Sequence, residues 1–192
     1  MVGRTLQDFN RIFLIEYGVR KSHLKEIINS GWIKFRNGVD EFLEFLHNHD
    51  IPLVIMSADG CGEAIPMFFE KNNKNYSNIY YIVNRFIWSK DGKAIGVKKP
   101  VIHSMNKDEM ILRKMPEIYI SIKNRRNIIL LGDSLSDIGM VKGFRYKNLM
   151  KIGFLNFEED RLRGEYAKSF DVVIEGDGDF GFVNKIIKSL AD

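Results

Sequence analysis

The sequence predicts an α/β fold, in which a mainly parallel sheet is covered by helices on both faces. Two observations predict it: short apolar runs of strand length recur along the chain, and segments with helical periodicity separate them. Strands that alternate with helices favour parallel pairing, because each crossover helix packs on a face of the sheet. The 192 residues, 45% of them hydrophobic, are enough for a domain with its own core.

The N-terminal region predicts two helices. Apolar residues recur at helical spacing between Leu6 and Ile28, Gly18 marks a break, and Ser22 is a plausible cap of the second helix. The apolar run Arg11–Tyr17 resembles a strand in composition, but its spacing favours a helix. We expect this region to be part of a helical cap.

The core is predicted for residues 37–192, after the partial cap in residues 1–36, and no Pro/Gly-rich linker marks a further independent domain. The predicted elements follow in order: helix Val39–His49, strand Leu53–Met56, strand Ile79–Val83, hairpin Phe86–Val97, strand Asn127–Leu131, a helix around Ser136–Lys142, strand Leu149–Phe154, a helix around Glu158–Lys168, and strand Asp171–Ile174.

Composition excludes several classes of protein. Cys61 is the single cysteine, so the chain alone forms no disulfide or cysteine-based zinc site, which favours a reducing, cytoplasmic setting. No apolar run approaches the ~20 residues of a membrane span, and Asp8 and Arg11 lie where a signal peptide needs an apolar core. The net charge of +4 comes from scattered residues, which indicates phosphorylated metabolites rather than nucleic acid as partners.

Two carboxylates follow the clearest predicted strand. Asp133 comes just after the apolar run Ile128–Leu131, at the end of a strand where open α/β sheets place their ligands, and Asp137 follows four residues later. Carboxylates are hard oxygen ligands suited to Mg²⁺. The alternative is an ordinary loop, in which Ser134 or Ser136 caps the next helix and Asp137 interacts with its N-terminal dipole.

A second strand end carries groups that suit a phosphate. Strand Leu53–Met56 leads into Ser57-Ala58-Asp59-Gly60-Cys61-Gly62, which offers a hydroxyl, glycines and free amides before a helix. The alternative is a strand-to-helix turn with a capping serine. Lys107 by itself predicts a solvated side chain, and only its place between the two strand ends makes it a candidate.

Taken in order, Ser57-Ala58, Lys107 and the stretch from Gly132 to Asp137 resemble the second, third and fourth motifs of haloacid dehalogenase (HAD) superfamily phosphatases. Three further stretches resemble the cytosolic 5'-nucleotidase III (pyrimidine 5'-nucleotidase) family, namely Asn106-Lys107-Asp108, Lys151–Asn156 and Ser169–Val173. The resemblance runs from about Lys21 to the C-terminus and implies a HAD-like Rossmannoid sheet.

The resemblance also implies roles. Ser57 and Ala58 would bind the phosphate, and the catalytic Lys107 would neutralise its developing charge. Asp133 would bind Mg²⁺ and Asp137 would support the metal site. The implied reaction is Mg²⁺-dependent hydrolysis of a nucleoside 5'-monophosphate, or another small phosphomonoester, through an aspartyl-phosphate.

One motif of the family is missing. Its first motif is a strand that ends in Asp-x-Asp and supplies the nucleophile and the general acid/base, and no such triplet precedes Ser57. Three hypotheses remain open: an enzyme whose nucleophile is supplied from outside this chain, an inactive phosphate or nucleotide binder, and an interaction protein. Because the family's missing strand is central, we expect a sheet that is interrupted, or completed by an N-terminal segment or an oligomer.

Overall fold

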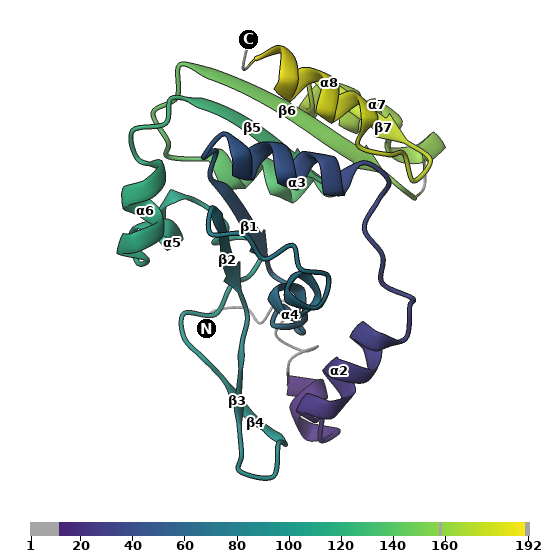
Figure 1. Cartoon of the computed structure of the whole chain (residues 1–192), viewed down its shortest axis with the longest axis vertical. Coiled ribbons are helices and arrows are strands. Elements are labelled where there is room, and N and C mark those ends of the chain that lie inside the picture. The colour runs from purple at the N-terminus through teal and green to yellow at the C-terminus, as the bar shows by residue number, and fades with distance from the viewer. Residues whose placement is uncertain (1–11, 158, 191–192) are drawn as a thin grey trace. The chain divides into compact units, whose positions relative to one another are not determined.

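The computed structural model describes residues 12–157 and 159–190. The chain divides into two compact units, and the elements of each are labelled in Figure 1. The first unit comprises Met1–Phe35 and Leu53–His103, and the second comprises Arg36–Pro52 and Ser104–Asp192. The expected boundary between a cap and a core at residue 36 remains a prediction.

The first unit contains helices, a parallel pair of strands and a hairpin. Its elements are α2 (Lys21–Asn29), β1 (Leu53–Ser57), α4 (Ala64–Lys71), β2 (Ile79–Val83), β3 (Phe86–Trp88) and β4 (Ala94–Val97). Strands β1 and β2 pair in parallel, from Leu53 opposite Ile79 to Ser57 opposite Val83. Strands β3 and β4 form the predicted antiparallel hairpin.

The helical prediction for the N-terminal region is confirmed where the structure describes it. Residues 12–16 are helical, and Gly18, at a φ of +73° that favours glycine, ends this segment. Helix α2 begins after Arg20 rather than at Ser22, because its N-cap is the extended Arg20. Leu6, Phe9 and Arg11, which also entered the prediction, lie outside the described residues.

The second unit contains a parallel three-stranded sheet. Its elements are α3 (Val39–Asn48), α5 (Glu109–Arg113), α6 (Pro116–Ile122), β5 (Asn127–Gly132), the 3-10 helix η1 (Leu135–Val141), β6 (Asn148–Leu155), α7 (Glu159–Ser169), β7 (Val172–Glu175) and α8 (Gly181–Ser189). The strand order is β5-β6-β7, and both pairings are parallel.

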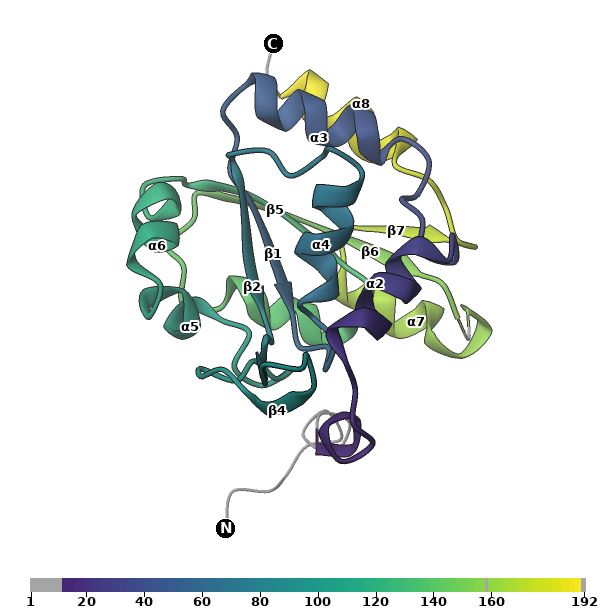
Figure 2. The ribbon, with the colours of Figure 1, turned by 60° about the horizontal axis from the view of Figure 1, so that its bottom comes forward.

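Helices cover both faces of this sheet, with α3 and α8 on one side and α7 on the other (Figure 2). Successive residues of β6 show why, because their side chains alternate between the faces. Phe154 stacks on Phe180, which precedes α8, with ring centroids 5.3 Å apart. Leu155 is buried with Tyr166 and Phe170 in the cluster formed by α7. The predicted two-sided parallel sheet is confirmed in this unit.

All predicted strands are confirmed to within two residues at either end, but the helices were predicted less completely. The helix expected around Ser136–Lys142 is the 3-10 helix η1, and the helix expected after the Ser57 turn is α4. Helices α5, α6 and α8 were not predicted. Among the described strands, β1 pairs with β2 and β3 with β4 in the first unit, and β5, β6 and β7 pair in the second. Whether the sheet is interrupted or completed by another segment remains a prediction. No helix in the described part of the chain has the length and hydropathy to cross a membrane.

Candidate functional site

The first group of candidate residues lies in the turn after β1. Ser57 is half-buried, and its hydroxyl accepts a hydrogen bond from the Asp59 amide at 3.2 Å. The Asp59 carboxylate accepts from the Cys61 amide at 2.6 Å. Helix α4 begins only at Ala64 and has Glu63 as its N-cap, so Ser57 does not cap it. The capping alternative for this serine is therefore wrong.

Asn84 holds this turn from the end of β2. Its side chain is 1% exposed, and its amide nitrogen donates to the carbonyls of Ala58 at 3.2 Å and Asp59 at 3.1 Å. The same side chain exchanges two bonds with the backbone of Ile102, both at 2.9 Å. A buried amide is stable only when it is hydrogen-bonded, and Asn84 meets this need by fixing two peptide groups of the Ser57 turn.

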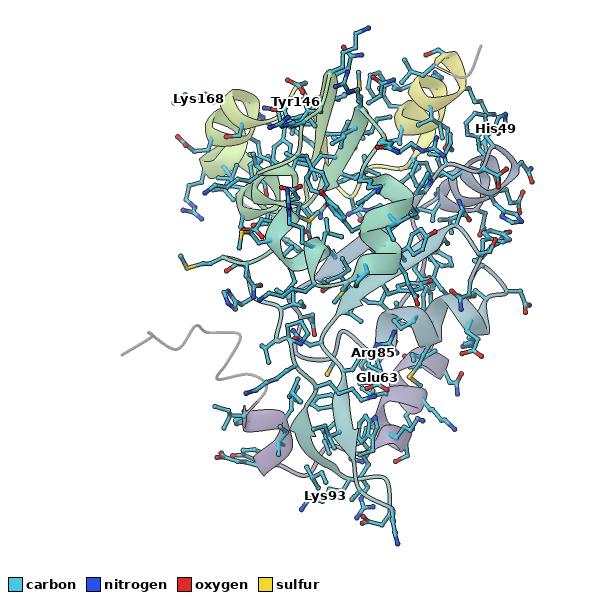
Figure 3. The ribbon with its side chains drawn as sticks, turned by 90° about the vertical axis from the view of Figure 1, so that its left-hand side faces the viewer. His49, Glu63, Arg85, Lys93, Tyr146 and Lys168 are labelled. Carbon is cyan, nitrogen blue, oxygen red and sulfur yellow. The ribbon has the colours of Figure 1, made fainter. Side chains whose placement is uncertain are left out.

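A separate open cavity of about 520 Å³ lies beside α4 and β2 in the first unit. Glu63 and Arg85, labelled in Figure 3, are among its lining residues. The Glu63 carboxylate accepts bonds from the Phe86 amide and the Trp88 indole, so it secures the start of the hairpin. Ser57 and Ala58 do not line this cavity, and we assign it no part in the candidate site.

The second group centres on a buried ion pair. Lys107 Nζ lies 2.5 Å from Asp137 Oδ1, and the two residues are 9% and 4% exposed. Lys107 comes just before α5, whose N-cap Asp108 accepts bonds from the amides of Met110 and Ile111. The expectation of a solvated Lys107 side chain is wrong, because the structure places the ammonium group against a buried carboxylate.

Asp137 also organises the loop that follows β5. Its Oδ2 atom accepts the amides of Asp133 and Ser134, both at 3.1 Å. Gly132 makes this approach possible, since a Cβ atom there would meet the Asp137 Cβ at 2.7 Å. Ser134 caps η1 by accepting the Ser136 amide at 3.3 Å. The capping interpretation is thus correct for Ser134, but it does not account for the buried pair with Lys107.

Asp133 is the exposed carboxylate of this group and follows the last residue of β5. Partial loss of hydration and the nearby negative charge of Asp137 raise its pKa. A cation would relieve this repulsion. The described residues contain no cluster of three or more His, Cys, Asp or Glu side chains, but Mg²⁺ needs only one or two protein carboxylates beside water and phosphate. The chemistry of these donors is therefore compatible with Mg²⁺, and Asp133 is the carboxylate that is exposed to solvent.

The structure therefore brings three of the predicted residues together: Lys107, Asp133 and Asp137 lie in one loop cluster of the second unit. Ser57 and Ala58 share a turn of the first unit. The sequence analysis missed two residues that hold these turns. Asn84 holds the Ser57 turn, and the Tyr166 hydroxyl donates to the Asp133 carbonyl at 2.7 Å. Asn84 was detectable as a polar residue directly after the apolar run of β2, whereas Tyr166 carried no signal within its helix.

An Asp-x-Asp triplet does occur later in the chain, at Asp177-Gly178-Asp179 after β7. Its carboxylates have structural partners. Asp177 Oδ1 lies 2.8 Å from Arg36 Nη1, and Asp179 Oδ1 accepts the Gly181 amide at 2.9 Å. The triplet therefore forms the turn into α8.

Comparisons with known proteins give a consistent picture. A 7-methylguanosine phosphate-specific 5'-nucleotidase of Gallus gallus is 31% identical over 176 residues, 91% of this chain and 60% of the relative. A putative cytosolic 5'-nucleotidase 3 of Caenorhabditis elegans is 31% identical over 171 residues, 87% of this chain and 45% of the relative. The chain thus spans 60% of the length of the first relative and 45% of the length of the second.

Solved structures agree on the fold. Cytosolic 5'-nucleotidase IIIB bound to cytidine matches with a TM-score of 0.71 and 30% identity, over 81% of this chain and 52% of the other. A substrate-bound phosphoserine phosphatase matches with a TM-score of 0.60 and 20% identity, over 94% of this chain and 77% of the other, which shows the α/β HAD fold alone. The family model described as pyrimidine 5'-nucleotidase (UMPH-1) matches residues 9–191. The chain therefore belongs to the pyrimidine 5'-nucleotidase (UMPH-1) family.

Proposed function

We propose that this chain supplies the phosphate- and metal-binding residues of a 5'-nucleotidase-type phosphomonoesterase. The observation that carries the proposal is the Lys107–Asp137 pair buried beside the exposed carboxylate of Asp133. Burying two charges costs more desolvation than burying an apolar pair of similar volume. Phosphoryl transfer needs fixed positive charge beside a metal ligand, because the phosphate carries several negative charges.

Each residue has a part in this proposal. Asp133 would hold Mg²⁺, and Asp137 would position Lys107 and the loop amides. Lys107 carries three donors, of which one serves Asp137, and we propose that the others bind phosphate oxygens. In the first unit, the Ser57 hydroxyl and the Ala58 amide are the groups that we propose to bind phosphate. Mg²⁺ would neutralise charge on the phosphate oxygens and orient the group.

Nucleoside 5'-monophosphates are the proposed substrates. The vertebrate relative is named for 7-methylguanosine phosphate, and the related solved structure holds cytidine. We further propose that the attacking aspartate comes from polypeptide outside this sequence, because no Asp-x-Asp precedes Ser57. The same observation favours the second candidate, a non-catalytic binder that holds nucleotide and metal without covalent chemistry.

Two measurements on the purified chain test the proposal. Phosphate release from cytidine, uridine and 7-methylguanosine 5'-monophosphates, with and without Mg²⁺, is expected to stay at background. Mg²⁺ together with nucleotide is nevertheless expected to raise the melting temperature, and Ser57→Ala and Lys107→Met should each reduce that rise. No melting shift with any nucleotide would contradict both candidate functions, and robust Mg²⁺-dependent turnover would show that the chain has its own nucleophile.

An N-terminally extended chain, made from the coding sequence upstream of Met1, separates the two candidates. Turnover that disappears when the first aspartate of an added Asp-x-Asp is replaced by asparagine supports the enzyme. Nucleotide binding without turnover, in an extended chain that carries no such triplet, supports the non-catalytic binder.

A further inference from the structure

Tyr166 connects a helix of the second unit to the candidate metal loop. It lies on α7, is 4% exposed, and packs in a cluster with Leu155 and Phe170. Its hydroxyl leaves this apolar cluster and donates to the Asp133 carbonyl oxygen at 2.7 Å. The contact spans 33 residues of sequence, so it is a tertiary interaction rather than a local turn.

The bond restrains the backbone of Asp133 from one side, while Asp137 restrains it from the other. Asp133 N donates to Asp137 Oδ2 at 3.1 Å, and Asp133 O accepts from Tyr166. The residue lies just beyond Gly132, the last residue paired in the β5–β6 ladder, so these two bonds replace strand pairing. With both peptide groups held, the Cα–Cβ direction of Asp133 is restricted, and so is the position of its carboxylate.

Filling the core does not by itself require the hydroxyl. Phenylalanine provides the same ring, and Phe170 does so in the same cluster, with ring centroids 5.3 Å from Tyr166. A buried hydroxyl needs a hydrogen-bond partner. Here the partner is the backbone carbonyl of Asp133, the residue whose carboxylate is exposed beside Lys107 and Asp137.

We propose that Tyr166 is a positioning residue, whose hydroxyl fixes the Asp133 peptide and so presets the Asp133 carboxylate for Mg²⁺. The metal part of this inference rests on the function proposed above. The positioning part concerns the protein alone and can be measured without metal.

The test uses Tyr166→Phe in the full chain, with Tyr119→Phe as the matched control. Tyr119 also lies in the second unit, where it is half-buried, and its hydroxyl donates to Glu109 Oε1 at 3.2 Å rather than to Asp133. By calorimetry, Tyr166→Phe should weaken Mg²⁺ binding roughly two- to tenfold, which corresponds to about 0.4 to 1.4 kcal/mol. Tyr119→Phe should leave Mg²⁺ affinity unchanged.

Hydrogen exchange without metal provides the second readout. The amides of Asp133 and Ser134 should exchange faster in Tyr166→Phe, while those of α7 keep their wild-type rates. Unchanged exchange at both loop amides, or equal acceleration throughout α7, would overturn the inference by showing no positioning or only general loosening. If the wild-type chain binds no Mg²⁺, the metal assignment of Asp133 fails, and the exchange result alone decides whether Tyr166 holds the Asp133 peptide.

Discussion

Replacing Lys107 by methionine is expected to destabilise the second unit strongly. Methionine keeps most of the apolar stem but leaves Asp137 as a buried charge without its counter-ion. Removing one partner of a buried ion pair costs about 3 to 5 kcal/mol, whereas an exposed pair contributes about 0 to 1 kcal/mol. The Lys107 and Asp137 side chains are only 10% and 6% exposed, so we expect a loss in the larger range.

Lys188→Met is the matched control, because Lys188 pairs with Glu41 in the same unit while their side chains are 49% and 53% exposed. It should cost less than about 1 kcal/mol. Both tryptophans, Trp32 and Trp88, lie in the first unit, so their fluorescence does not follow the second. Native-state hydrogen exchange of the β5 amides, which report the opening of the sheet in the second unit, is therefore the assay.

A further outcome follows from the same physical picture. Adding Asp137→Asn to Lys107→Met should recover part of the lost stability, since asparagine can still accept a bond from the loop amides. A cost for Lys107→Met no larger than that of Lys188→Met would refute the reasoning and show that Asp137 tolerates burial without a counter-ion.

The remaining predictions concern the loop after β5. Asp133→Asn should weaken Mg²⁺ binding in calorimetry far more than Asp137→Glu, and equal affinities would remove the metal assignment. Because the folded-state pKa of Asp133 is raised, its contribution to stability is present at low pH and is lost as the pH rises through that value. Asp133→Asn should therefore raise the melting temperature of the metal-free chain at neutral pH, and an unchanged melting profile from acidic to neutral pH would contradict this. Gly132→Ala should cost roughly 1 to 3 kcal/mol, because its Cβ would lie 2.7 Å from the Asp137 Cβ. Gly164→Ala on α7 meets nothing within 4 Å and should stabilise the helix slightly, by about 0.5 to 1 kcal/mol; equal effects of the two substitutions on melting temperature would exclude the steric argument.

The strands were predictable because their signal is local. Most residues of the predicted strands are apolar, and burial on both faces of a parallel sheet favours that pattern. Helices such as α5 and α6 are short and were missed, since five or seven residues are too few for helical periodicity to be recognised. The 3-10 form of η1 also depends on its surroundings, where Asp137 closes the turn onto the amides of Asp133 and Ser134.

The sequence alone determined the fold class, the strand ends at Ser57 and Asp133, and the candidate set that includes Lys107 and Asp137. The fold class and the strand ends follow from hydrophobic pattern and residue type, which act over a few neighbouring positions, whereas Lys107 became a candidate through its place between the strand ends and the family resemblance. Only the tertiary structure decided that Lys107 is buried against Asp137, that Asn84 holds the Ser57 turn, and that Tyr166 holds the Asp133 carbonyl. Such contacts join residues 25 to 33 positions apart. Their partners are selected by packing and by the need to satisfy buried polar groups, and neither leaves a local pattern in the chain.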